Sequence, residues 1–180
     1  MRDTNRQYLD QLDDCRKMFV AKMKDYGPSW RILRPESITD QIFIKAKRIR
    51  TLQITGVAAV NEGIRPELVG IVNYAVMGII QLSLPLTESK DISAAQALEL
   101  YDTVTTQAFE LMKAKNHDYG EAWRDMRMSS YVDLILAKIL RTKEIEDNRG
   151  AVKVSEGIDA NYFDMINYAI FGLIKLSEQC

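Results

Sequence analysis

Apolar residues recur along this chain every three or four positions, the spacing that places side chains on one face of an α-helix. One such face consists of Val132, Leu136, Ile139 and Leu140. A second consists of Phe163, Ile166, Ile170 and Leu173. Nowhere in the sequence do apolar and polar residues alternate for long enough to indicate a β-strand. The pattern therefore predicts an all-α chain.

The pattern predicts three helices in each half of the chain. In the first half they are expected at Thr4–Lys24, at Ile38–Ile54, and from after Asn61 to near Ser83. In the second half they are expected at Ser93–Lys115, at Tyr131–Glu146, and from after Ser155 to near Ser177. Asn61 and Ser155 are favourable N-caps, and Ser93 with Gln96 has the spacing of a capping box. Gly27 and Gly120 can take the left-handed conformation that ends a helix.

The two halves are copies of one another. AKMKDYGPSW begins at Ala21 and AKNHDYGEAW begins at Ala114, 93 positions later. NYAVMGIIQLS from Asn73 matches NYAIFGLIKLS from Asn167 at an offset of 94. We therefore divide the chain into repeat one (1–83), a linker (84–92) and repeat two (93–180). Three such helices bury little apolar surface alone, so we expect a six-helix bundle with one shared core, a pseudo-twofold axis and the third helices at its centre.

Composition narrows the class of protein. A net charge of −1 over 180 residues argues against binding to bulk nucleic acid or to an anionic membrane. The apolar run 68–86 is long enough to span a membrane, but its counterpart carries Asp164 and Lys175, which favours a buried core helix. Cys15 and Cys180 form no disulfide framework and the N-terminus has no apolar signal stretch, so a cytoplasmic protein is expected. The sequence is also compatible with a homo-oligomer.

The motif DYG-x2-W places aromatic residues directly after the first helix of each repeat. In repeat two these are Tyr119 and Trp123, with Lys115 and Asp118 beside them. The aromatic side chains are expected either to plug the core or to form a stacking platform for a nucleobase. His117 is the only histidine, which excludes a His-rich metal site and a Ser-His-Asp triad.

The second helix of each repeat carries the pattern Asp-x4-Lys-x2-Arg. In repeat two the residues are Asp133, Lys138 and Arg141; in repeat one they are Asp40, Lys45 and Arg48. The lysine and arginine lie about 60° apart around the helix, off its apolar face. Two cations on one edge suit a phosphate group, whereas the alternative is a solvated face with ion pairs along the helix.

The third helix of repeat two carries the acidic residues Glu156, Asp159 and Asp164. Carboxylate oxygens are the ligands that Mg²⁺ prefers, so these three are candidate metal ligands. Asp159 and Asp164 lie about 140° apart around the helix, so one helix cannot aim all three at one ion. Repeat one has Arg65 and Gly70 in place of the two aspartates, so any metal is expected in repeat two. Because clustered carboxylates repel one another, we expect Asp159→Asn or Asp164→Asn to leave stability unchanged or raised.

Asn73 and Asn167 interrupt the most apolar helix of each repeat. A buried asparagine needs hydrogen-bond partners. Each is therefore expected either to tie two central helices together or to line a polar pocket, where Asn167 would contact a nucleotide.

The combination of DYG-x2-W, Asp-x4-Lys-x2-Arg, an acidic helix start and NYA resembles the nucleotide modification associated domain 1 family, a domain of unknown function. The resemblance extends over both repeats and most of the chain. Members occur in bacteria and in phages, where they are linked with hypermodified DNA nucleotides. The resemblance implies a role in nucleotide metabolism, with a small-molecule nucleotide as partner.

A more distant resemblance is to the all-α nucleoside triphosphate pyrophosphohydrolases, the MazG and dimeric dUTPase group. Those enzymes hold Mg on helices that bear E-x-x-E and E-x-x-D, and Glu156-x-x-Asp159 has the second spacing. The second helix departs from that pattern, because Asp133, Lys138 and Arg141 stand where E-x-x-E is expected.

Three functions are consistent with the sequence. The first is a Mg-dependent nucleotide phosphohydrolase, in which Lys138 and Arg141 hold phosphate while Asp133, Asp159 and Asp164 position the metal and water. The second is a non-catalytic nucleotide-binding module that uses the same cations and aromatic side chains without a metal. The third is a helical interaction protein whose repeats serve only packing.

Overall fold

The computed structural model describes residues 3–56, 63–153 and 156–179. These residues contain six α-helices, two short 3-10 helices and no strand, which confirms the predicted all-α bundle. Repeat one consists of α1 (Thr4–Tyr26), η1 (Ser29–Ile32), α2 (Pro35–Thr55) and α3 (Ile64–Ser83). Repeat two consists of α4 (Ala94–Tyr119), η2 (Ala122–Asp125), α5 (Met128–Asp147) and α6 (Ile158–Ser177).

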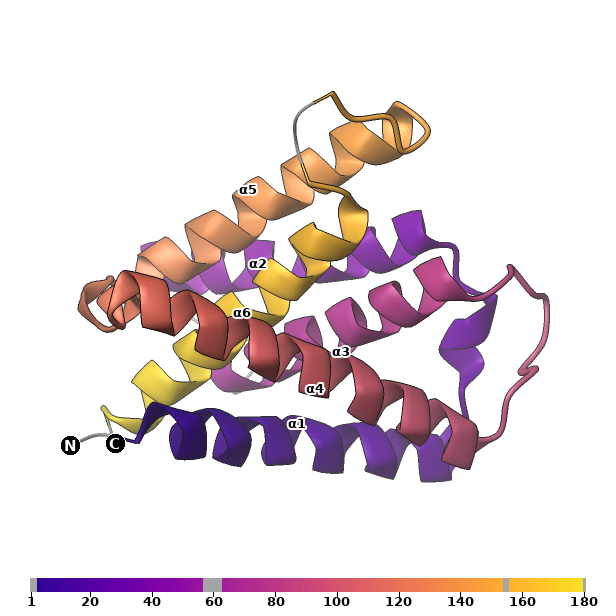
Figure 1. The fold of residues 1–180 in the computed structure, drawn as a ribbon, viewed down its shortest axis with the longest axis horizontal. Coiled ribbons are helices and arrows are strands. Elements are labelled where there is room, and N and C mark those ends of the chain that lie inside the picture. Colours follow the sequence, from indigo (N-terminus) through magenta and orange to yellow (C-terminus); the bar gives the residue numbers. More distant parts are fainter. Residues whose placement is uncertain (1–2, 57–62, 154–155, 180) are drawn as a thin grey trace.

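The six helices form three layers, each with one helix from each repeat (Figure 1). The central layer is α3 and α6, which pack against each other more extensively than any other pair of helices. On one side they are covered by α2 and α5, and on the other side by α1 and α4. Buried side chains from both repeats join in a single hydrophobic core.

The helix ends follow the local signals in most places. Ser93 and Gln96 form the expected capping box, and Gly120 ends α4 with a left-handed backbone (φ 60°, ψ 36°). The second helices begin three residues earlier than expected, because Pro35 serves as a first-turn residue of α2 and α5 begins at the equivalent Met128. The proposed caps Asn61 and Ser155 lie outside the described residues. The sequence pattern did not predict η1 and η2.

The central helices approach closely at two glycines. A Cβ atom on Gly78 of α3 would lie 2.8 Å from the ring of Tyr162, and one on the equivalent Gly172 of α6 would lie 3.2 Å from Leu68. By length and composition α3 could cross a membrane, with a mean hydropathy of 1.2. However, 67% of the 18-residue apolar stretch that gives this value is buried inside the protein, as expected for the central helix of a bundle.

Reciprocal hydrogen bonds relate the two repeats. The Tyr8 hydroxyl in α1 donates to Asn167 Oδ1 in α6 (2.7 Å), and the equivalent Tyr101 hydroxyl in α4 donates to Asn73 Oδ1 in α3 (2.8 Å). The asparagine Nδ2 atoms donate to equivalent backbone carbonyls, those of Ala108 and Cys15. Each central helix is therefore hydrogen-bonded to α1 of repeat one and to α4 of repeat two, in the pattern that a pseudo-twofold axis requires.

A second reciprocal pair of contacts joins α2 to α5. Asp40 pairs with Lys143 at 2.9 Å, and its counterpart Asp133 pairs with Arg50 at 2.8 Å. Arg50 and Lys143 occupy equivalent positions in the two repeats. These exposed ion pairs contribute little stability individually, but they show that Asp40 and Asp133 contact the opposite repeat.

We expect Tyr8→Phe and Tyr101→Phe each to lower the free energy of unfolding by about 1–3 kcal/mol, because each leaves a buried asparagine oxygen without its donor. The measurement is urea denaturation followed by circular dichroism. Tyr26→Phe is the control, since Tyr26 is 47% exposed and a surface change of this kind costs less than about 0.5 kcal/mol. Unchanged stability in both buried-tyrosine variants would contradict the structural role of these bonds.

Candidate functional site

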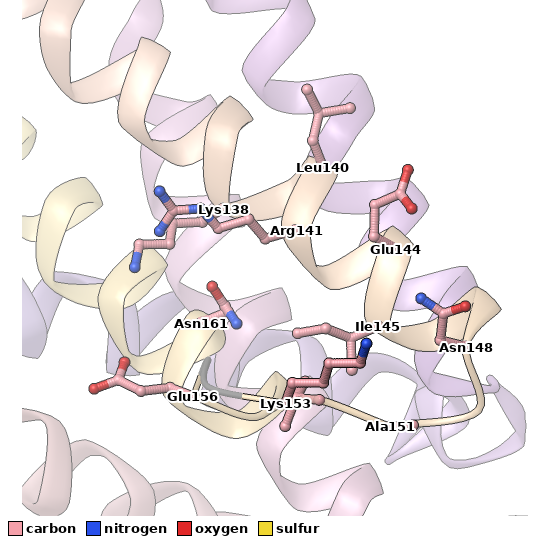
Figure 2. Close-up of a pocket in the computed structure, with 11 residues that line it drawn as sticks. Lys138, Leu140, Arg141, Glu144, Ile145, Asn148, Ala151, Lys153, Glu156 and Asn161 are labelled. Carbon is pink, nitrogen blue, oxygen red and sulfur yellow. The ribbon is translucent and has the colours of Figure 1, made fainter.

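A cleft of about 1000 Å³ opens between the second half of α5, the α5–α6 connection and the start of α6 (Figure 2). This volume lies at the upper end of the range for small-molecule sites. The charged residues that line the cleft are Lys138, Arg141, Glu144, Lys153 and Glu156. The remaining lining residues are the amides Asn148 and Asn161 and the aliphatic Leu140, Ile145, Ala151 and Val152.

Two cations on α5 form one edge of this α5–α6 cleft. Lys138 and Arg141 are three residues apart on the helix and extend from α5 in the same direction (Figure 2). The sequence pattern predicted this common edge, because positions three apart are neighbours on a helix surface. Arg141 is exposed and makes no hydrogen bond or ion pair with any described residue. Its guanidinium donors are therefore not engaged by any described residue at the cleft edge.

Asp164 lies beside this edge, where it joins three helices. Its carboxylate on α6 pairs with Lys115 of α4 and with Lys138 of α5, each at 2.6 Å. The Asp164 side chain is only 9% exposed, so its charge is removed from water and depends on these two ammonium groups. Sequence reasoning selected all three residues as site candidates, but it did not predict that they pair with one another.

The two lysines determine how Asp164 titrates. Burial raises the pKa of Asp164, but the hydrogen bonds from Lys115 and Lys138 outweigh burial and hold that pKa below its ordinary value. Burial lowers the pKa of Lys115, but the hydrogen bond and the charge of Asp164, with smaller contributions from Tyr168 and Glu156, together outweigh burial and raise that pKa above the ordinary value. Asp164 is therefore an ionised carboxylate near neutral pH and a poor candidate for a general acid.

The corresponding cations of repeat one are neutralised in a different way. Lys45 and Arg48 both contact Glu67, at 3.5 Å and 2.6 Å, and the Glu67 side chain is 12% exposed. Gly70 stands at the position of Asp164, and a Cβ atom there would lie 2.7 Å from Lys45 Cε. The Lys45 side chain thus packs against Gly70, at the position where repeat two has the Asp164 carboxylate.

The candidate metal ligands do not converge. Glu156 lines the α5–α6 cleft, whereas Asp159 lines a different, smaller cavity of about 450 Å³. Asp164 is already engaged by two lysines. Within residues 3–56, 63–153 and 156–179, no group of three or more acidic, histidine or cysteine side chains is arranged to hold a metal. This arrangement of donors does not fit the Mg²⁺ ion that the distant resemblance implied.

Three other candidates lie in structural contacts. Asp133 is paired with Arg50 on the α2–α5 surface. The amide oxygen and nitrogen of Asn167 are both bonded within the core. Trp123 is 7% exposed, with its ring stacked on Phe171 at a centroid distance of 4.2 Å. The ring of Trp123 is therefore not available as an open stacking platform.

The end of α4 provides the remaining candidates of repeat two. Tyr119 is 74% exposed and is the last residue of α4. Asp118 is also exposed, and its one partner in the described part of the chain is the neighbouring His117, at 3.2 Å between Oδ1 and Nδ1. Lys115, one turn earlier in α4, is the residue of this group that forms an ion pair with Asp164.

Sequence reasoning missed several residues of the cleft, above all Asn161. This side chain is buried on the first turns of α6 and donates to the Gly157 carbonyl at 2.9 Å. The available signal was the difference between the repeats, since Asn161 stands at the position of Glu67. No sequence pattern pointed to Asn148 and Lys153, because these cleft residues follow the end of α5 and lie outside its helical periodicity.

We expect Asp164→Asn to lower the free energy of unfolding near pH 7 by about 1–3 kcal/mol, since it removes the only ion-pair partner that the described residues give Lys115 and Lys138. This reverses the expectation from sequence, in which carboxylates would have repelled one another. Because the folded pKa of Asp164 is lowered, its contribution is present above the unfolded pKa of about 3.9 and is lost as pH falls through the folded value.

Urea denaturation of the parent and of Asp164→Asn between pH 7 and acid measures this contribution. The difference between the two proteins should shrink as the pH falls below about 4. Asp159→Asn is the matched control, because Asp159 is exposed and should change stability by less than about 0.5 kcal/mol at every pH. A pH-independent difference would show that Asp164 does not act through its charge.

Comparison with known proteins identifies a family but no reaction. The nucleotide modification associated domain 1 pattern matches residues 22–82 and residues 115–176, once in each repeat. No curated protein and no solved structure matches the chain. Since the two matches cover most of the sequence and coincide with the structural repeats, the chain belongs to the nucleotide modification associated domain 1 family, as two tandem copies.

Proposed function

We propose that the chain binds a small nucleotide in the α5–α6 cleft, with the nucleotide phosphate at Lys138 and Arg141. The observation that carries the proposal is the Arg141 guanidinium, which has no partner among the described residues and lies beside Lys138 at the edge of a cleft of ligand size. A guanidinium presents paired N–H donors that match two phosphate oxygens, and an ammonium adds a compact charge. The family description, which associates these domains with nucleotide modification, supports a nucleotide over other phosphates.

Lys138 can serve Asp164 and a phosphate together. An ammonium group has three N–H donors, and the ion pair with Asp164 uses one of them. The buried carboxylate then has a positioning role, because it holds the lysine head group beside Arg141. Lys115 supports the same carboxylate from α4.

The rest of the cleft suits the uncharged part of a nucleotide. Ile145, Val152 and Leu140 provide apolar surface, and Asn148 provides an amide for hydrogen bonds to a base or sugar. No aromatic side chain lines the cleft among the described residues, so the base would be held by aliphatic contacts and amide hydrogen bonds rather than by stacking.

The proposal concerns binding and requires no metal. The cleft contains the carboxylates Glu144 and Glu156, but it lacks a convergent acidic set in the described part of the chain. We therefore favour a nucleotide-binding module over the Mg-dependent phosphohydrolase. A cytoplasmic location, where nucleotides are abundant, is part of this proposal.

The first experiment is a panel of nucleoside mono-, di- and triphosphates tested for thermal stabilisation, with either Mg²⁺ or EDTA. A ligand at 100 times its Kd adds about 2.7 kcal/mol of stability, which such a screen detects. We expect stabilisation in EDTA, and no hydrolysis of the ligand after long incubation with Mg²⁺. Binding that requires Mg²⁺, or turnover of the ligand, would favour the phosphohydrolase instead.

Arg141→Ala should weaken binding of the best nucleotide by about 10- to 100-fold, because a hydrogen bond to a charged group contributes about 1.5–3 kcal/mol. Titration calorimetry measures the change. Arg127→Ala is the matched control, since Arg127 is an exposed residue at the opposite end of α5 and its loss should leave the affinity unchanged. Equal affinity of Arg141→Ala and the parent would reject the α5–α6 cleft as the phosphate site.

A further inference from the structure

We infer that repeat one contains, in its own Glu67 carboxylate, an internal substitute for the anion that repeat two takes from its ligand. The residue at this position is Glu67 in repeat one and Asn161 in repeat two. It then determines which repeat binds the anionic ligand. The inference rests on the proposed function, and it adds the chemical class of the anchoring group and the residue that controls the site.

The first support is the geometry of the Glu67 contact. The Glu67 carboxylate bridges the lysine and the arginine of α2, with Oε2 at 3.5 Å from Lys45 Nζ and Oε1 at 2.6 Å from Arg48 Nη1. The carboxylate is almost fully buried, so the pair is satisfied inside the protein rather than by solvent. Repeat one therefore shows how this cation pair binds an oxyanion.

The second support is the substitution at the same position in repeat two. Asn161 replaces Glu67, so repeat two has no carboxylate at the position that bridges the lysine and the arginine in repeat one. The carboxylate of repeat two lies three residues later, at Asp164, where it engages Lys138 and Lys115. Arg141 makes no such contact with any described residue, although its counterpart Arg48 does.

These two observations define the group that fits. The ligand oxygens would take the places of the two Glu67 oxygens, so the anchoring group carries at least two oxygens on one centre. A terminal phosphate monoester meets this requirement and matches the donor fork of an arginine. The Asn161 amide next to it is neutral, so it permits an anion that a glutamate would repel.

The experiment compares Asn161→Glu with Asn161→Gln, which have the same size and differ in charge. The probes are a nucleoside monophosphate, the matching nucleoside without phosphate, and inorganic phosphate, each measured by titration calorimetry. In the parent we expect the monophosphate to bind, inorganic phosphate to compete with it, and the nucleoside to bind at least about 10-fold more weakly. Asn161→Glu should weaken the monophosphate by at least about 10-fold, whereas Asn161→Gln should retain it.

Two further variants separate occupation of the site from other effects. Ala151→Glu adds the same charge at another point of the cleft without removing a polar group, and it should weaken binding less than Asn161→Glu does. Asn161→Asp has the same size as asparagine, and it should also weaken binding, which keeps the test valid if Asn161→Glu does not fold. Circular dichroism melting curves check the fold of each variant.

The outcomes distinguish the inference from the proposed function. If Asn161→Glu and Asn161→Asp fold and bind the monophosphate as the parent does, the inference is wrong and nucleotide binding stands. If Asn161→Gln or Ala151→Glu loses as much affinity as Asn161→Glu, size or general repulsion explains the loss and the inference is again wrong. If the parent binds none of the nucleotides tested, the proposed function fails and the inference fails with it.

Discussion

The central helices α3 and α6 are apolar on nearly every face, so each must be surrounded by other helices before it is stable in water. One repeat cannot provide that cover, because its two remaining helices leave a face of the third helix open. Duplication solves the problem by letting the third helices cover each other. Gly78 and Gly172 permit the close approach, since a side chain at either position would meet the opposite helix. The other contacts between the repeats follow from this central packing.

The central packing also fixes the roles of the buried polar residues. Asn73 and Asn167 face outer helices of both repeats, and a tyrosine and a backbone carbonyl satisfy each amide. Because these contacts recur in both repeats, they belong to the shared fold rather than to a site in one repeat. A residue conserved between the two copies can therefore be structural even when it is polar and lies in the most apolar helix.

The functional candidates lie where the repeats differ. Both repeats place a lysine and an arginine on the edge of the second helix, and both provide one buried carboxylate nearby. The carboxylate stands at residue 67 in repeat one and at residue 164 in repeat two, which are not equivalent positions. This shift satisfies the arginine of repeat one and leaves Arg141 without a partner among the described residues. Differences at two equivalent positions, Glu67/Asn161 and Gly70/Asp164, thus separate a cation pair bridged by an internal carboxylate from one whose arginine has no such contact among the described residues.

The sequence by itself determined the local structure and the duplication. Apolar spacing, glycines and a capping box locate six helices and identify α3 and α6 as central, because these signals depend on neighbours within one or two turns. The same periodicity placed Lys138 and Arg141 on one edge of α5.

Only the tertiary structure decided which charges meet. Asp164 was grouped with other acids from its own helix, but its partners come from α4 and α5. Asp133 was a catalytic candidate, but it pairs with Arg50 across the α2–α5 surface. Helical periodicity specifies the direction of a side chain around its own axis, whereas ion pairing depends on how separate helices pack. That packing brings together residues many positions apart, and no local pattern encodes it.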